Sequence, residues 1–222
     1  MLLLSAAEAR VVGCLLEKEA TTPEYYPMTL NALVNACNQK SSREPVMSLD
    51  EMTVVHAIAR LRDNGIVEEK SEAGNRVPRY AHKFERLMPA TPEERAALCV
   101  LLLRGPQTTG EIRGRSGRLY DFKGPAEVET VLQGLMTRPE PIVTKLGRMT
   151  GHKENRYAQL LSGALTEDAS APMVPVTAPA AKTAPAASDE RLEALESKVE
   201  ALRRDVNAIK ERLSGAFGGT PA

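Results

Sequence analysis

Basic side chains gather at a few places in the sequence, in a pattern that suits contact with phosphate groups. In a helix-turn-helix arrangement, basic residues hold the nucleic-acid backbone while the second helix of the motif enters the major groove. The first set of candidate contacts is Lys40, Arg43, Arg60, Arg62, Arg76 and Arg79. The second set is Arg113, Arg115, Arg118, Lys123, Arg148, Lys153 and Arg156. We expect these side chains to bind backbone phosphates of DNA.

The overall charge gives this expectation little support, because 29 basic residues are balanced by 29 acidic ones. Only residues 91–162 lean basic, with 11 Lys and Arg against 8 Asp and Glu, a net charge of +3. Acidic residues also open the helices that would face the bases, at Asp50-Glu51 and at Glu127 and Glu129. Carboxylates near phosphates weaken binding, although they also complement a helix N-terminus. A non-enzymatic protein-interaction scaffold is therefore the alternative function.

The polar segment 35–43, together with Tyr25 and Tyr26, is the candidate surface for either function. Its side chains offer more hydrogen-bonding and stacking capacity than a plain connection needs. The alternative is a structural role, in which Asn38 and the serines that follow it cap helix ends while the tyrosines complete the core.

Residues that could perform catalysis are scattered through the chain. The histidines, which form no His-x-x-x-His pair, are His56, His82 and His152. The cysteines, which form no Cys-x-x-Cys pair and fall in apolar helical patterns, are Cys14, Cys37 and Cys99. No phosphate-binding loop of the form G-x-x-x-x-G-K-[ST] occurs. We expect no enzymatic activity, cofactor or metal. We also expect a location in the reducing cytoplasm, because no apolar run approaches the roughly 20 residues of a membrane span.

The first part of the chain predicts three helices followed by a hairpin. Ser5 with Glu8, and Ser48 with Glu51, fit capping boxes at the starts of the first and third helices. Gly65 suits a left-handed exit from the third helix. The inward positions of that helix are expected at Met52, Val55, Ala59 and Leu61. The first two helices are expected at about residues 6–20 and 29–38, and the strands at 66–70 and 77–81.

The same order of elements then returns. Thr91, Pro92 and Glu94 provide an N-cap, a first-position proline and a capping glutamate for a helix that ends at Gly105-Pro106. Further helices are expected at about 108–114 and 125–137, and strands at 142–146 and 156–160. Residues 65–67 align with 141–143 at an offset of 76, and residues 79–81 with 156–158 at an offset of 77. The chain therefore contains two copies of one unit.

The C-terminal part has a different composition. Alanine and proline dominate about residues 163–188, which predicts a semi-extended linker. Beyond it, an a/d heptad seam predicts a coiled coil, with a parallel pair mildly favoured by charge. Its members are Leu192, Leu195, Val199, Leu202, Val206, Ile209 and Leu213. The alternative is that this amphipathic helix packs on the rest of the chain or binds another protein.

Several segments resemble the YceH-like family of uncharacterised bacterial proteins. They are LLEK (15–18), TPEYYPM (22–28), ACNQKSSREPVM (36–47), LLLRGPQT (101–108) and GEIR (110–113). The resemblance covers about residues 4–162 and implies a tandem winged-helix fold, with little information about activity.

Together these observations predict a mainly α protein with small β-hairpins, of the α+β class. The expected domains are winged helices at 1–88 and 89–162, a linker at 163–188, a coiled-coil helix at 189–214 and a tail at 215–222. The expected function is that of a dimeric, transcription-regulator-like DNA-binding module, with a protein partner as a further possibility and no role at a membrane.

Overall fold

A computed structural model of the protein describes residues 3–70, 77–147 and 154–163. These residues all fall within one compact unit. Several sequence predictions lie outside the described residues. They are those for Arg76, Arg148, Lys153, the linker, the heptad positions Leu192, Leu195, Val199, Leu202, Val206, Ile209 and Leu213, and the tail.

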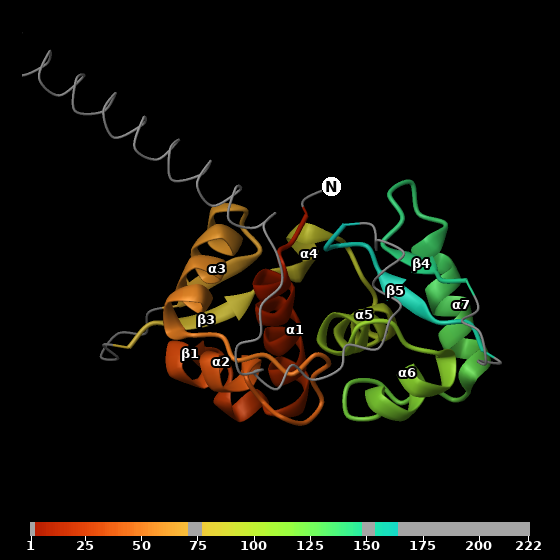
Figure 1. The fold of residues 1–222 in the computed structure, drawn as a ribbon, viewed down its shortest axis with the longest axis horizontal. Coiled ribbons are helices and arrows are strands. Elements are labelled where there is room, and N and C mark those ends of the chain that lie inside the picture. The colour runs from red at the N-terminus through yellow and green to blue at the C-terminus, as the bar shows by residue number, and fades with distance from the viewer. Residues whose placement is uncertain (1–2, 71–76, 148–153, 164–222) are drawn as a thin grey trace, which may run out of the picture. The chain divides into compact units, whose positions relative to one another are not determined.

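The N-terminal lobe, residues 3–88, is built from helices around a small antiparallel sheet (Figure 1). Its strands follow the order β1-β3-β2, with Met28 opposite Tyr80 and Val67 opposite His82. The elements are α1 (Ala6–Thr21), η1 (Pro23–Tyr25), β1 (Met28–Thr29), α2 (Leu30–Cys37), α3 (Glu51–Asp63), β2 (Val67–Lys70), β3 (Arg79–His82) and α4 (Phe84–Leu87).

The C-terminal lobe, residues 89–163, repeats this order with a smaller sheet. An isolated β-bridge between Gln107 and Tyr157 is the counterpart of the β1–β3 pairing in the N-terminal lobe. The elements are α5 (Pro92–Arg104), α6 (Thr109–Ser116), α7 (Pro125–Met136), β4 (Val143–Lys145) and β5 (Tyr157–Gln159). The described residues are thus mainly helical with small antiparallel sheets, as the sequence predicted.

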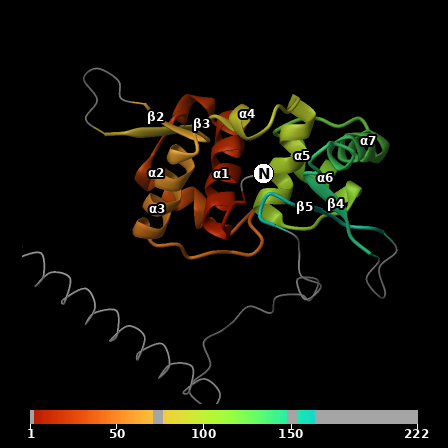
Figure 2. The same ribbon diagram turned by 90° about the horizontal axis from the view of Figure 1, so that it is seen from above.

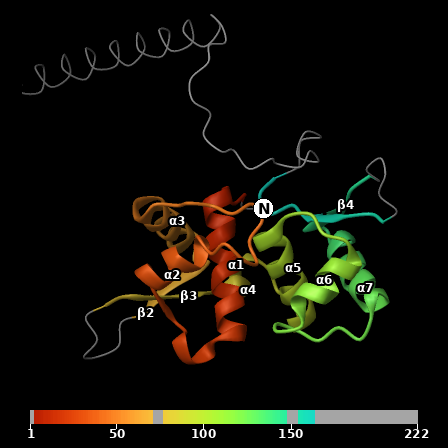
Figure 3. The same ribbon diagram turned by 60° about the horizontal axis from the view of Figure 1, so that its bottom comes forward.

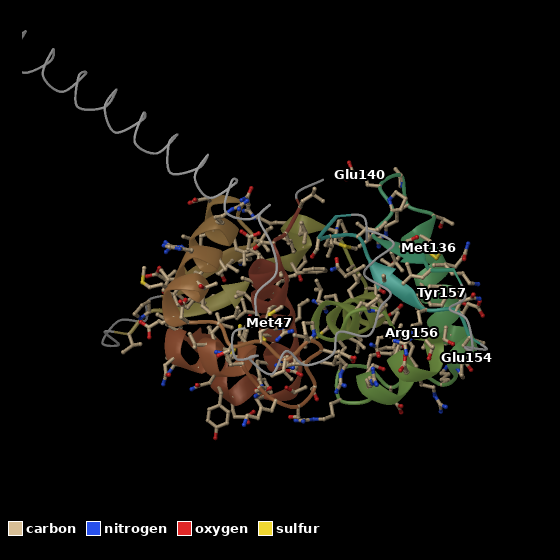
Figure 4. The ribbon with its side chains drawn as sticks, in the orientation of Figure 1. Met47, Met136, Glu140, Glu154, Arg156 and Tyr157 are labelled. Carbon is tan, nitrogen blue, oxygen red and sulfur yellow. The ribbon has the colours of Figure 1, made fainter. Side chains whose placement is uncertain are left out.

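An arginine in each lobe donates the same kind of hydrogen bond to a proline carbonyl. Arg79 donates from Nη1 to the carbonyl of Pro27 at 3.0 Å. Arg156 donates from Nη1 to the carbonyl of Pro106 at 2.9 Å, and it lies beside Tyr157 in Figure 4. Each proline directly precedes the residue that pairs with the tyrosine following the arginine. The two arginines are 77 residues apart, as expected, and the two prolines are 79 apart. Arg79 and Arg156 therefore hold the sheets together.

Helix caps agree with the sequence at α1 and α5 but not at α3. Reciprocal capping boxes form at Ser5 with Glu8 and at Thr91 with Glu94. At α3 the cap is Asp50, which accepts from the Thr53 amide at 2.7 Å, so the prediction of a capping box at Ser48 was wrong. Hydrogen bonds from the Thr53 side chain and amide lower the pKa of Asp50.

The residues just before α3 are not helical, because the Asn38 side chain, at the end of α2, hydrogen-bonds to the Leu49 backbone. Asn38 accepts from the Leu49 amide at 2.7 Å and donates to the Leu49 carbonyl at 2.8 Å. Helical structure therefore begins only after this point. Of the predicted inward positions of α3, Leu61 is buried, but Met52, Val55 and Ala59 are not. The other buried positions are Val54, Ala57 and Ile58. Gly65 has a φ of 70°, as its expected left-handed exit requires.

Helices α1 and α5 pack against each other and join the two lobes through one hydrophobic core (Figures 2 and 3). Every residue of α5 from Ala96 to Leu103 is buried, because α1 covers one side and α6 and α7 cover another. The close approach needs glycine at position 13, where a Cβ would lie 2.8 Å from Leu103 Cδ2. The Cys99 thiol donates to the Gly13 carbonyl at 3.5 Å.

Two buried arginines tie α1 to the connection between α2 and α3. Arg10 donates to the carbonyls of Cys37 at 2.9 Å and Pro45 at 2.7 Å. Arg43, whose side chain is 0% exposed, donates to both carboxylate oxygens of Glu17 at 3.1 and 2.6 Å. Burial removes Arg43 from the predicted phosphate contacts and gives it a structural role.

None of the helices in the described part of the chain combines the length and the apolar character that crossing a membrane requires.

Replacing Gly13 with valine tests the contact between α1 and α5. We expect the free energy of unfolding to fall by about 2 kcal/mol, because the added carbons overpack a well-filled core. Urea unfolding followed by circular dichroism measures it. The matched control is Gly134→Val on α7, where a Cβ would meet nothing within 4 Å. Equal losses in both variants would contradict the close approach.

Replacing Glu17 with glutamine tests the Arg43 anchor. We expect a loss of about 2 kcal/mol in the same unfolding measurement, because a buried guanidinium would keep its charge and lose its carboxylate partner. Glu24→Gln, at an exposed position in η1, should change little. Indistinguishable unfolding curves for the two variants would show that the ion pair does not hold this connection.

Candidate functional site: cations where the lobes meet

Most of the predicted phosphate contacts in the described residues are engaged within the protein. Arg60 pairs with the buried Glu8 at 3.0 Å, and Arg62 pairs with Glu69 at 2.6 Å. Both cations lie on α3, the helix that would read bases in the N-terminal lobe. Their charge is partly neutralised by these carboxylates, so α3 offers a phosphate less attraction than its sequence suggests.

Glu111 organises a second group of engaged arginines at the start of α6. It caps the helix with Thr108, and it lies 3.6 Å from Arg115 and 3.4 Å from Arg156. Arg115 also donates a hydrogen bond to the side chain of Gln107. These arginines hold α6 against the segment that bridges to β5, and this contact limits their use as external phosphate ligands.

Four predicted contacts keep their charge without an acidic partner in the described residues. Lys40, Arg118 and Lys123 make no side-chain hydrogen bond or ion pair within 3–70, 77–147 and 154–163. Arg113 uses only its Nε, which donates to the Phe122 carbonyl at 3.2 Å. All four side chains are exposed. We call Arg113, Arg118 and Lys123 the α6–α7 edge, because they lie on α6 and on the turn that leads to α7.

Lys40 and Arg118 come together in a pocket at the meeting point of the lobes. The pocket has a volume of about 440 Å³. Lys40 approaches from the connection after α2, Lys18 from α1, and Arg118 from the turn after α6. We call it the interlobe pocket. Figure 3 shows α5 between α1 and α6, and α5 packs against both helices.

The wall of the interlobe pocket is held by the Arg43 anchor. Gln39, Ser41 and Ser42 line the pocket, and Ser42 has a φ of 60°, in the left-handed region. Arg43 donates to the Ser42 carbonyl at 2.9 Å and to the Gln39 side chain at 3.0 Å. A non-glycine residue keeps this backbone conformation where surrounding contacts enforce it. The polar groups of the wall are therefore fixed by the buried ion pair behind them.

The sequence located part of this pocket and missed the rest. The polar segment 35–43 was identified as a candidate surface, and its residues from Gln39 to Ser42 form the wall. Tyr25 and Tyr26 do not belong to the pocket. Tyr25 is 72% exposed elsewhere, and the Tyr26 hydroxyl accepts from the His82 amide at 2.7 Å. Burial raises the pKa of Tyr26.

The sequence analysis did not predict Lys18 as a site residue, because no pattern within α1 indicates that its side chain lines a pocket with residues of the other lobe. Its ammonium lies 3.7 Å from the Glu17 carboxylate, which Arg43 already binds through both oxygens. The single acidic group in the lining is thus largely neutralised. The pocket consequently presents an excess of positive charge.

The cysteines are core residues, as their helical patterns predicted. Cys14, Cys37 and Cys99 are all buried. A hydrogen bond with Cys14 and burial raise the pKa of Cys37, and burial raises the pKa of Cys99. Neither thiol is activated as a nucleophile. Within the described residues, no group of three or more His, Cys, Asp or Glu side chains is arranged to hold a metal ion.

Comparisons with known proteins give the chain a family. The family model described as "Protein of unknown function, DUF480" matches residues 4–152. A UPF0502 protein of Pelobacter propionicus is 47% identical over 218 residues, which cover 98% of each chain. A UPF0502 protein of Koribacter versatilis is 52% identical over 160 residues, covering 72% of this chain and 74% of its own.

A UPF0502 protein of Photobacterium profundum is 45% identical over 214 residues, covering 94% of this chain and 96% of its own. Similarity at this level extends well beyond the segments that first indicated an uncharacterised bacterial family. The chain belongs to the DUF480 family of bacterial proteins, which includes these UPF0502 relatives.

Proposed function

We propose that the protein is a tandem winged-helix module that binds DNA through backbone phosphates at the α6–α7 edge. The order of elements in each lobe supports the fold part of this proposal. Three helices precede a hairpin, and a short strand or bridge before the second helix joins the hairpin as a third member. This is the arrangement in which winged helices place a helix-turn-helix beside a β-hairpin.

The observation that carries the binding part is the unpaired charge of the α6–α7 edge. Arg113, Arg118 and Lys123 are exposed and have no acidic partner in the described residues. They lie on the second helix of the unit and on the turn before the third. Residues at that turn are placed to contact the backbone when the third helix approaches a groove.

The third helices themselves favour phosphate contact over base recognition. The exposed side of α7 includes Glu129, Thr130 and Gln133 and no basic side chain. On α3, the basic residues Arg60 and Arg62 are paired with carboxylates. We therefore expect affinity that depends strongly on salt and weakly on sequence.

A protein-interaction scaffold is the second candidate, and exposed apolar side chains favour it. Val46 is 56% exposed in the connection before α3, and Met52 is 60% exposed in the first turn of that helix. Apolar groups near the start of α3 suit contact with protein better than contact with phosphate. The DNA-binding measurement below separates the two functions.

Binding of a random-sequence DNA duplex, measured by fluorescence anisotropy at about 50 and 200 mM salt, tests the proposal. We expect the full chain to bind at the lower salt and to lose affinity steeply at the higher. Lys123→Ala and Arg113→Ala should each lower the slope of log affinity against log salt by about 0.9, the value for one phosphate contact.

The matched control is Arg86→Ala, which removes an exposed arginine on α4 of the other lobe and should leave the slope unchanged. Unaltered binding by both α6–α7 edge variants would exclude that edge as the DNA contact. Absence of binding by the unaltered chain at 50 mM salt would favour the scaffold.

We also propose that the protein dimerises through its heptad positions, which would strengthen DNA binding by linking two modules. A variant with Leu195→Lys and Leu202→Lys should lose dimer formation, because it places charges in the apolar seam. Chemical crosslinking and sedimentation measure the oligomer. A control with Glu193→Lys and Glu200→Lys changes charge at b positions, outside the a, d, e and g positions, and should still form dimers. Unchanged oligomer size in the seam variant would contradict the proposal.

A further inference from the structure

We infer that the interlobe pocket binds the phosphate group of a small, non-aromatic phosphate monoester such as a sugar phosphate. The pocket shares Arg118 with the α6–α7 edge. Its other cations, Lys18 and Lys40, come from the other lobe, so the inference does not depend on DNA binding. The pocket has room for more than a bare ion, with a volume of about 440 Å³. A ligand in the pocket would be bound by side chains from both lobes.

The charge of the pocket matches a phosphate monoester. Lys18, Lys40 and Arg118 contribute three positive charges to the lining, and Glu17 contributes one negative charge, a net of +2. A phosphate monoester carries a charge of about −1.5 to −2 near neutral pH. A single carboxylate would neutralise only half of the positive charge, so a dianionic group is the better complement.

Two of these cations are available because they have no other partner. Lys40 and Arg118 make no side-chain hydrogen bond or ion pair in the part of the chain that the structure describes. Glu17, the one acid in the lining, is bound through both oxygens by Arg43 and does not compete for them. The side chains of Ser41 and Ser42 add hydroxyl donors for the remaining phosphate oxygens.

The chemistry of the wall also indicates what the phosphate is attached to. Among the described residues that line the pocket, all are polar or charged and none is aromatic. A nucleobase would find no ring on which to stack, whereas the hydroxyl groups of a sugar could hydrogen-bond to Gln39, Ser41 and Thr21. A polyhydroxylated phosphate therefore suits the site better than a nucleotide.

Isothermal titration of the full chain with glucose 6-phosphate tests the inference. The titration is made at about pH 8 in dilute chloride buffer, with inorganic phosphate and glucose titrated in parallel. We expect saturable binding of glucose 6-phosphate at one site per chain, weaker binding of inorganic phosphate and none of glucose. Lys40→Ala and Arg118→Ala should each weaken binding at least tenfold.

Lys123→Ala is the control, because it removes an exposed, unpaired charge from the α6–α7 edge outside the pocket and should leave the sugar phosphate affinity unchanged. Thermal unfolding confirms that each variant is folded. Absence of binding, or binding that Lys40→Ala leaves intact, would overturn the inference.

The same variants distinguish a free phosphate from a backbone phosphate. If Lys40→Ala weakens DNA binding while the unaltered chain binds no sugar phosphate, the pocket serves the DNA backbone and the small-ligand inference fails. If DNA does not bind but glucose 6-phosphate does, in a manner that depends on Lys40, the inference stands and the proposed DNA function fails.

Discussion

Helix α1 lies so close to α5 that a side chain at Gly13 would meet Leu103 and Leu102, and this contact sets the geometry of the interlobe pocket. One hydrophobic core extends through the two helices into both lobes. The two lobes therefore share one core and do not form two separately packed domains. Lys40 and Arg118, which are far apart in sequence, can line one pocket only because this packing fixes the lobes together.

The arginines in the described residues include some that build the structure and others that remain free of acidic partners. Arg43 anchors the pocket wall, while Arg79 and Arg156 join each sheet to the segment before its second helix. An arginine serves such roles well because its planar group makes several hydrogen bonds at once. Lys40, Arg118 and Lys123, by contrast, lie on connections after second helices and stay free of acidic partners in the described residues. This division concentrates usable positive charge where the lobes meet and along the α6–α7 edge.

Local signals in the sequence predicted the elements well, and contacts between distant residues account for what it missed. Capping residues such as Ser5 and Thr91 act within one turn, so their helices were predictable. The start of α3 depends on Asn38 holding Leu49, which no local pattern shows. The same reason explains the site: a list of basic residues cannot indicate that Arg43 is buried against Glu17 or that Lys18 and Arg118 line one pocket.

Lysine footprinting by mass spectrometry tests the central claim, that free cations in the interlobe pocket and along the α6–α7 edge bind phosphate groups. The full chain would be acetylated briefly with DNA, with glucose 6-phosphate, or with neither. The account predicts that DNA protects Lys123 and that the sugar phosphate protects Lys40, while Lys70, paired with Glu68 on β2, reacts equally in all three samples. Equal reactivity of Lys40 and Lys123 with and without both ligands would contradict it.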